Sequence, residues 1–237
     1  MTLRPLLDLV LPTECAGCHR TGLPWCRRCR RALDRLAFPG GPRPVTPDPP
    51  PAGVPLVYAW GAYADPLRAA ITAWKDEGRR DLVAELAPLL GAALSAAVEG
   101  ADGSNVPLVV PAPSSRRSRR VRGDVPLHEL ADRAVHLLCL PGLEVLMALD
   151  ERWGVRDQSG LATTARQVNV SGAFHVPRAR RPLVAGRDCI VVDDVMTTGA
   201  TLVEGARALR ESGARRVLGA VVAVPRRRRG GRARRAQ

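Results

Sequence analysis

Aromatic residues are scarce in this chain of 237 residues, since Phe, Trp and Tyr together make up only 3%. A chain of this length can bury a full core, and with 46% hydrophobic residues the core must be packed mainly from aliphatic side chains. We find no apolar run of the ~20 residues that cross a bilayer, so we expect no membrane span. The apolar start of the chain is interrupted by Asp8 and followed by Glu14, which makes a poor signal peptide and favours a cytoplasmic location.

Lysine is almost absent as well. Lys75 is the only one, so the net charge of +13 comes almost wholly from arginine. Part of this charge is concentrated in residues 226–237, RRRRGGRARRAQ. Two interpretations of this segment remain open, because charge alone fits both: a solvated, disordered tail, or a tail that contacts nucleic-acid phosphates.

The most informative segment runs from Cys189 to Leu202, CIVVDDVMTTGATL. Its β-branched run predicts a buried strand over 190–192, and the apolar pattern after it predicts a helix over 202–212. Asp193, Asp194 and a turn rich in hydroxyls lie between them, where open α/β sheets bind ligands. Threonine hydroxyls, a glycine and the N–H groups of a helix start suit a phosphate dianion. The carboxylates would repel that phosphate and instead suit neighbouring sugar hydroxyls or a hydrated divalent cation.

An ordinary strand end followed by a helix cap would also contain aspartate and threonine, because these residues commonly cap helices and occupy turns. The complete order of apolar strand, Asp-Asp, Thr-Thr-Gly and Thr favours the phosphate site, since each part serves that site. The segment contains neither the Walker pattern nor G-x-G-x-x-G.

Four of the six cysteines form two C-x-x-C pairs separated by seven residues: Cys15, Cys18, Cys26 and Cys29. Two such pairs are typical of a tetrahedral zinc site, because each pair turns tightly enough to aim both thiolates at one ion. We therefore predict a structural Zn²⁺ in a small zinc-ribbon-like module over residues 1–38, which bound metal would help to fold. Disulfides or free thiols are the alternative. Cys139 and Cys189 lie in apolar runs and are expected in the core.

Composition divides the rest of the chain. The Pro/Gly-rich residues 39–55 predict an extended linker, residues 56–225 a larger domain, and residues 226–237 the basic tail. Periodicity within the larger domain predicts helices over 66–98, with a break at Gly78, and over 127–138, and strands over 108–110, 143–149 and 216–224. Gly213 is expected to end the helix that follows the phosphate loop.

Two further loops are candidates for the same site. An arginine-rich loop, SSRRSRRVRG, follows the strand at 108–110 and would share its sheet edge with Asp193 if the sheet is parallel. Arginine side chains bind phosphate oxygens in pairs of hydrogen bonds, so this loop could hold a pyrophosphate; a solvated basic loop is the alternative. Residues 151–170 form a long polar segment of the kind that often serves as an active-site lid.

Together these segments resemble the ComF family, whose members are similar to phosphoribosyltransferases and are associated with natural transformation, the uptake of single-stranded DNA. The resemblance rests on the cysteine pairs, the lone lysine in AWKDEG, the loop VPAPSSRRSRRVRG, the segment QSGLATTARQVNVSGAF and VVDDVMTTGAT. The last of these resembles the phosphoribosyl pyrophosphate (PRPP) motif of type I phosphoribosyltransferases. The implied fold is α/β, a parallel sheet flanked by helices with the small cysteine module at its N-terminus.

The resemblance also implies a ligand and the residues that bind it. Asp193 and Asp194 would hold the ribose hydroxyls and help to hold Mg²⁺, and they are the candidate catalytic residues. The loop would bind PRPP through Val195, Met196, Thr197, Thr198, Gly199, Ala200 and Thr201, with the 5′-phosphate on Thr197 to Thr201. Candidates for the pyrophosphate are Ser114, Arg116, Arg117, Arg119 and Arg120. Arg166 and Asn169 would belong to the lid.

Three functions follow from these features. One is an Mg²⁺-dependent phosphoribosyltransferase, for which no segment identifies the acceptor. Another is a protein that binds PRPP or a nucleotide without turnover and handles single-stranded DNA with a partner helicase. Residues 124–126, Asp-Val-Pro, replace the aromatic-Asn-Gln run usual in the family and lean toward this second function. A zinc-ribbon protein that binds nucleic acid is the third, but it leaves the order Asp-Asp-Thr-Thr-Gly unexplained.

Overall fold

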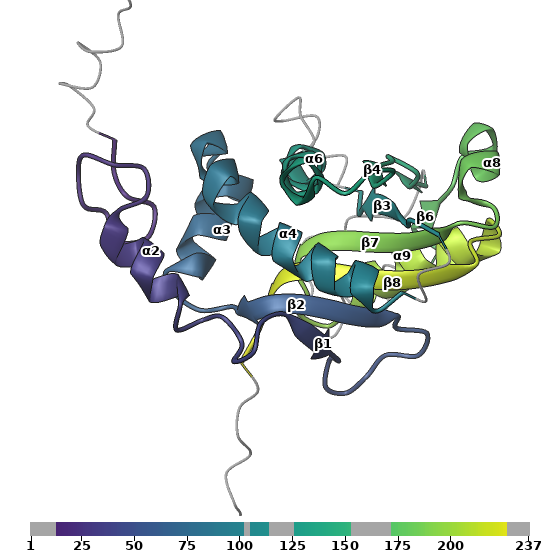
Figure 1. Ribbon diagram of the computed structural model, residues 1–237, viewed down its shortest axis with the longest axis horizontal. Coiled ribbons are helices and arrows are strands. Elements are labelled where there is room, and N and C mark those ends of the chain that lie inside the picture. The colour runs from purple at the N-terminus through teal and green to yellow at the C-terminus, as the bar shows by residue number, and fades with distance from the viewer. Residues whose placement is uncertain (1–12, 102–104, 114–125, 153–171, 227–237) are drawn as a thin grey trace, which may run out of the picture.

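The computed structural model describes residues 13–101, 105–113, 126–152 and 172–226. Its centre is a six-stranded sheet of order β1-β2-β8-β7-β3-β4 (Figure 1). The strands are β1 (Arg43–Val45), β2 (Leu56–Ala62), β3 (Leu108–Pro111), β4 (Glu144–Val145), β7 (Asp188–Val195) and β8 (Arg216–Val224). β1 is antiparallel to β2, and the other neighbouring pairs are parallel. The predicted α/β fold with a mostly parallel sheet is confirmed.

Helices flank both faces of this sheet. The longer ones are α3 (Leu67–Asp76), α4 (Val83–Glu99), α6 (Pro126–Leu138) and α9 (Ala200–Glu211). The shorter elements are α2 (Arg27–Leu33), η1 (Arg80–Leu82), η2 (Arg178–Arg180), α8 (Arg181–Val184) and the separate antiparallel pair β5 (Asp150–Glu151) and β6 (Phe174–His175).

Strand β7 shows why helices are needed on both faces. Ile190 and Val192 are buried in the cluster that contains α3, α4 and α6, whereas Cys189 and Val191 are buried in the cluster that contains α9. Because successive side chains of a strand point to opposite faces, an uninterrupted apolar run requires a covering layer on each side. The sequence CIVV therefore fixes β7 as a central strand.

Several element boundaries agree with the sequence and one does not. Gly78 and Gly213 both adopt positive φ, at the expected helix break and helix end. The strand expected at 143–149 is only two residues long, because the N–H of Ala148 bonds back to the carbonyl of Leu146 in a local turn. Ala148 and Leu149 are buried in the same cluster as α9. This stretch is therefore apolar because its side chains lie in the core, and not because it pairs as a strand.

Residues 39–55 are not the free spacer that their composition predicts. Arg43–Val45 pairs with β2 as the outermost strand of the sheet. Proline lacks an N–H and is tolerated in a strand at a sheet edge, which is the position that Pro44 takes. The division of the chain into domains stays a prediction, but this segment forms part of the described sheet.

Helix Arg80–Glu99, which joins η1 and α4, corrects the expectation that no apolar run is long enough to cross a membrane. By length and composition alone it could do so, with a mean hydropathy of 1.6 in its most apolar window, of which 56% is buried. It packs against α6, β2 and β8, and Leu86, Leu90 and Leu94 are buried in that layer. Its apolar residues are thus those of a core helix.

Asp188, the first residue of β7, is almost fully buried, and its carboxylate accepts two hydrogen bonds from Arg215 at 2.9 and 2.6 Å. We predict that Arg215→Met lowers the free energy of unfolding by about 2 kcal/mol, because it leaves a buried carboxylate without this partner. Urea unfolding measures the change. Arg68→Met, which removes the exposed ion pair with Asp65, should cost less than about 0.5 kcal/mol, and equal losses would contradict the prediction.

Candidate functional site

Two adjacent carboxylates stand at the carboxyl end of β7. The strand continues to Val195, so Asp193 and Asp194 are among its last residues instead of following it. Asp194 is buried, with 4% of its surface exposed, whereas Asp193 is half-buried. An oxygen of the Asp193 carboxylate accepts the backbone N–H of Asp194 at 2.9 Å. Asp194 is thus the more enclosed of the two carboxylates, and Asp193 is partly exposed.

Lys75 contacts the inner carboxylate, although sequence reasoning assigned it no role in the site. It lies in the last turn of α3, 119 positions before Asp194, and its ammonium group lies 2.9 and 2.7 Å from the two carboxylate oxygens. The sequence does contain a signal for Lys75, because it is the only lysine in a chain whose other positively charged side chains are arginines. A position that keeps the flexible lysine side chain in such a chain is a candidate for a specific contact.

The charges at this edge influence one another. Burial raises the pKa of Asp193 well above its ordinary value, and the negative charge of Asp194 raises it further. Burial works to lower the pKa of Lys75, but the carboxylates of Asp194 and Asp193 outweigh it and raise that pKa. Lys75 is therefore protonated at neutral pH and offsets part of the charge of the pair.

The turn after β7 has the form expected of an anion-binding loop. Gly199 has φ +80° and directly precedes α9, whose Val203 N–H bonds to the Gly199 carbonyl at 2.9 Å. A Cβ at Gly199 would also lie 2.9 Å from the ring of Pro47, so glycine is required both by the backbone angle and by space. The first N–H groups of α9 and the threonine hydroxyls meet at this turn, where negative charge is stabilised.

The residues of the loop contribute in different ways. Thr197 is exposed, and Thr198 and Thr201 are half-buried, so their hydroxyls lie at the surface of the turn. Val195 and Met196 pack into the two hydrophobic clusters on opposite faces of the sheet. These two residues can offer a ligand only backbone groups. Ala200 likewise has no polar side chain, and its N–H lies 3.4 Å from the Thr198 hydroxyl.

The second predicted loop begins at the same edge. β3 is parallel to β7 with Pro111 opposite Val192, and the N–H of Ala112 bonds to the Val192 carbonyl at 2.9 Å. β3 and β7 are thus parallel, as the prediction of a shared sheet edge required. The pyrophosphate candidates themselves lie outside the described residues: Ser114, Arg116, Arg117, Arg119 and Arg120.

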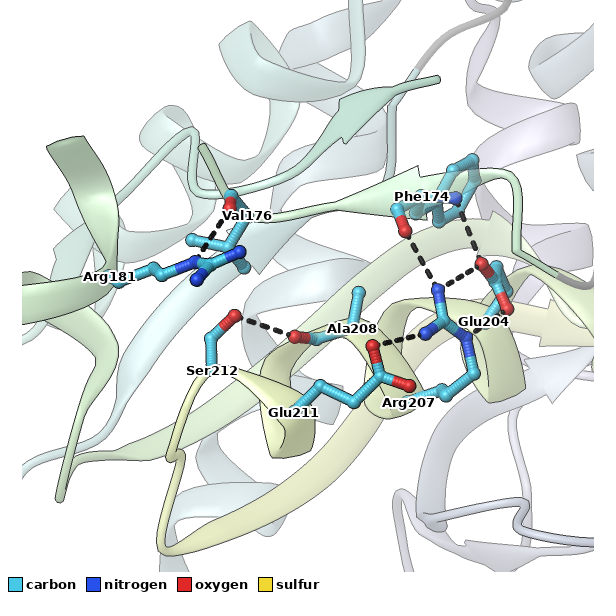
Figure 2. Close-up of polar contacts among 8 residues, drawn as sticks. All are labelled: Phe174, Val176, Arg181, Glu204, Arg207, Ala208, Glu211 and Ser212. Atoms are coloured by element: carbon cyan, nitrogen blue, oxygen red, sulfur yellow. Dashed lines mark hydrogen bonds and ion pairs between the residues drawn. The ribbon is translucent and has the colours of Figure 1, made fainter. Parts of the chain in front are cut away.

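The lid candidates Arg166 and Asn169 also lie outside the described residues, and the description resumes at Gly172. Figure 2 shows Phe174 of β6 bonded through both its N–H and its carbonyl to α9. The partners are Glu204, at 2.9 Å, and Arg207, at 2.8 Å, and these two side chains also form an ion pair. Burial tends to raise the pKa of Glu204, but Arg207 and the N–H groups of Phe174 and Gly172 lower it.

A groove of about 580 Å³ lies beside the loop, between α9 and the Pro-rich segment 49–53. Thr198 and Ala200 form its end next to the phosphate loop, and Arg207 and Glu211 lie farther along α9. Arg210 of α9 links the two sides of the groove by donating a hydrogen bond to the carbonyl oxygen of Gly53 at 3.0 Å. The segment expected to be a linker therefore borders the candidate site.

The two cysteine pairs converge on one point. All four sulfur atoms lie within 4.8 Å of one another, and those of Cys18 and Cys26 are 3.6 Å apart. Tetrahedral zinc with bonds of ~2.3 Å places its sulfur ligands ~3.8 Å apart, so the cluster has the size of such a site. All six cysteines of the chain are unpaired, which excludes the disulfide alternative in this structure. Cys189 is buried as expected, but Cys139 is exposed, which corrects the prediction for that residue.

Backbone N–H groups already favour thiolates in this cluster. The N–H of Cys29 lowers the pKa of Cys26 to about 6. Burial tends to raise the pKa of Cys15, but the N–H of Cys26, 3.3 Å from its sulfur, helps to lower it. Burial and the neighbouring sulfurs raise the pKa of Cys29. Metal ligation requires the thiolate form, and a bound cation would favour it for the whole set. The four residues could thus hold a metal ion such as zinc.

The cysteine segment belongs to the same hydrophobic cluster as α3, and Figure 1 draws α2 next to α3. Trp25, Cys29 and Leu33 are buried in the same cluster as Ile71 and Trp74 of α3. Two polar contacts reinforce the packing: Arg79 donates to the carbonyl of Glu14, and Arg30 pairs with Glu85 of α4.

Parts of this chain are similar to known proteins. The model of the phosphoribosyl transferase domain matches residues 130–236, which include β7, the loop, α9 and β8. The matched range, residues 130–236, is less than half of the 237-residue chain. The matched range leaves out Lys75 and the cysteine cluster, so these belong to the part of the chain that the domain model does not describe.

Short segments of curated proteins are similar to this chain. Ribose-phosphate pyrophosphokinase of Shewanella oneidensis is 45% identical over 64 residues, which are 26% of this chain and 19% of that protein. The enzyme of the same name from Pasteurella multocida is 65% identical over 34 residues, or 14% of this chain and 11% of that protein. The chain thus spans less than a fifth of the length of these relatives.

Two solved structures are similar to this chain at low TM-score and low sequence identity. Glutamine PRPP amidotransferase from B. subtilis, complexed with ADP and GMP, has a TM-score of 0.35 and 18% identity, covering 60% of this chain and 26% of that one. The allosteric regulatory enzyme of purine biosynthesis has a TM-score of 0.34 and 18% identity, covering 57% and 25%.

We predict that Cys15→Ser/Cys29→Ser lowers the bound metal from one ion per chain to nearly none and lowers Tm by at least about 5 °C, because the cluster packs on α3. Elemental analysis after purification without chelator and a thermal melt measure the two quantities. Cys139→Ser is the matched control, since that thiol is exposed and outside the cluster. A metal-free wild-type chain, or the same Tm in both variants, would contradict a structural metal site.

Proposed function

We propose that this chain is a ComF-type, cytoplasmic protein that binds PRPP at the carboxyl edge of β7, with Mg²⁺, as a phosphoribosyltransferase. The observation that supports it best is the junction of Asp193, Asp194 and the glycine turn before α9, within a phosphoribosyl transferase domain. The proposal includes a structural Zn²⁺ on the four cysteines.

The geometry suits the two ends of a sugar phosphate. The 5′-phosphate would accept hydrogen bonds from Thr197, Thr198, Thr201 and the first N–H groups of α9, where the helix dipole favours an anion. The ribose hydroxyls would donate to the carboxylates at the end of β7. A carboxylate binds hydroxyls and repels phosphate, so the charge pattern orients the ligand with its sugar toward β7 and its 5′-phosphate toward α9.

The residues present fit hydrated Mg²⁺. This ion prefers oxygen ligands and is usually held by one or two carboxylates together with substrate phosphates. Asp194 gives both its oxygens to Lys75, whereas Asp193 is more exposed, so Asp193 is the better candidate ligand. Bound Mg²⁺ would offset the charge that develops on the departing pyrophosphate.

Transfer would then depend on positioning more than on acid or base chemistry. Displacement of pyrophosphate from C1 passes through a state with positive charge on the sugar, and the nearby carboxylates can stabilise that charge. The loop holds the 5′-phosphate and fixes the ribose, so that C1 faces the edge from which β3 and its basic loop leave the sheet. Arg116 and its neighbours are the proposed partners of the leaving pyrophosphate.

We expect wild-type protein to bind PRPP in the presence of Mg²⁺, and Asp193→Asn/Asp194→Asn to bind at least about 100-fold more weakly, because ribose and cation lose their carboxylates. Isothermal titration calorimetry measures both affinities. Asp65→Asn, which changes an exposed carboxylate on the surface, is the control. Equal affinity in the double variant would contradict the site. Release of pyrophosphate on incubation with candidate acceptors separates transfer from binding alone.

A second candidate function is the handling of single-stranded DNA with a partner helicase. The observation that favours it is the surface of the cysteine segment: Arg27, Arg28, Arg31 and Arg35 are exposed and form no ion pair with another described residue. Together with the basic residues 226–237, they would provide contacts to phosphates.

Under this second function, Arg27→Ala/Arg28→Ala/Arg31→Ala should weaken binding to an oligo-dT strand and reduce the slope of log K against log salt by about 2, since each lost contact to a single strand removes ~0.7. Fluorescence anisotropy at several salt concentrations measures the slope. Deletion of residues 226–237 tests the tail in the same way. An unchanged slope in both variants would assign these arginines to solvation alone.

A further inference from the structure

Lys75 lies outside residues 130–236, the range that matches the domain model, and contacts Asp194 inside that range. Its ammonium group has three donors, and among the described residues both oxygens of Asp194 accept from it, at 2.9 and 2.7 Å. The side chain of Lys75 is 49% exposed, whereas that of Asp194 is only 6% exposed. The pair therefore has a buried carboxylate on one side and a cation that reaches the surface of the site on the other.

A buried carboxylate at this position needs a partner. Removing the cation from a buried ion pair leaves an uncompensated charge, which is costly in the low dielectric of a protein interior. Asp193 cannot supply the compensation, because it carries the same sign of charge and is adjacent in sequence. Lys75 and Asp193 both contact Asp194 among the described residues, and of these two only Lys75 is positive.

The position of Lys75 is itself fixed by packing. It follows Trp74, which is 1% exposed, and the face of α3 that includes Leu67, Ala70 and Ile71 is buried. The same cluster contains Cys15, Cys29 and Trp25 of the cysteine segment. A helix held on one side by the cysteine segment therefore delivers the ammonium group to the end of β7 on the other side.

We propose that Lys75 is a positioning residue of the phosphoribosyl site, which acts through Asp194: it holds the inner carboxylate in place so that Asp193 is the carboxylate presented to the ribose and the cation. This inference rests on the proposed PRPP site and divides its two aspartates by role. Asp193 contacts ligand, and Asp194 together with Lys75 sets the position and charge of the strand end.

A double-mutant cycle on the full-length protein tests this assignment, with PRPP and Mg²⁺ as the probe. We expect Lys75→Met and Asp194→Asn each to weaken the affinity about tenfold, and the double variant to be no weaker than the poorer single one, because residues that act through one pair are not additive. Lys75→Arg, which keeps the charge, should restore most of the affinity. Asp193→Asn should be the most damaging single change.

Controls keep the outcomes distinct. Arg68→Met lies on the same helix in an exposed ion pair and should leave the affinity unchanged. Circular dichroism and a thermal melt verify folding, and Lys75→Gln replaces Lys75→Met if the latter does not fold. Losses that multiply in the double variant, or wild-type affinity in Lys75→Met, would overturn the role of Lys75 while leaving the PRPP site intact. A wild-type chain that does not bind PRPP would overturn the proposed function and this role with it.

Discussion

The burial of β7 on both faces is the constraint on which the rest of this structure depends. From Asp188 to Val192 the strand has no exposed side chain, and both its neighbours are parallel to it. Such a strand can carry polar chemistry only where it leaves the two covering layers. The carboxylates at 193 and 194 and the turn before α9 occupy that exit, so the place of the site follows from the packing of the strand.

Parallel pairing brings the other candidate segments to the same exit. β3 ends beside Val192, and β8 ends beside Val195, where Met196 bonds to Ala223. The ends of strands that are far apart in the chain therefore meet at one edge. Gly199 has a positive φ, turns the chain from the strand into the helix within a few residues and leaves no room for a Cβ beside Pro47.

Local sequence patterns predicted the features that depend on interactions between residues close in sequence. The apolar run of β7, the polar turn, α9 and its glycine end all depend on neighbours in sequence, and they are confirmed. The cysteine spacing likewise predicted convergence, because each pair is a local turn. The pairing of β1 with β2 and the contact of Lys75 with Asp194 depend on how distant segments pack, which neither periodicity nor spacing reports. The proline-rich composition even argued against a strand at β1. An edge strand, however, tolerates proline, whereas a central strand does not.

The cysteine segment acquires a structural meaning from this packing. It is too short to bury a core alone, but it shares one with α3 and α4, to which it contributes Trp25, Cys29 and Leu33. A metal ion on its four sulfurs would hold one wall of that core, and α3 would carry the effect to Lys75 and so to Asp194. Under the role proposed for Lys75, one member of the carboxylate pair is held from within the fold and the other is left for the ligand. Two like charges are adjacent at the end of β7, and the fold offsets part of their repulsion by bringing Lys75 from a distant part of the chain to Asp194.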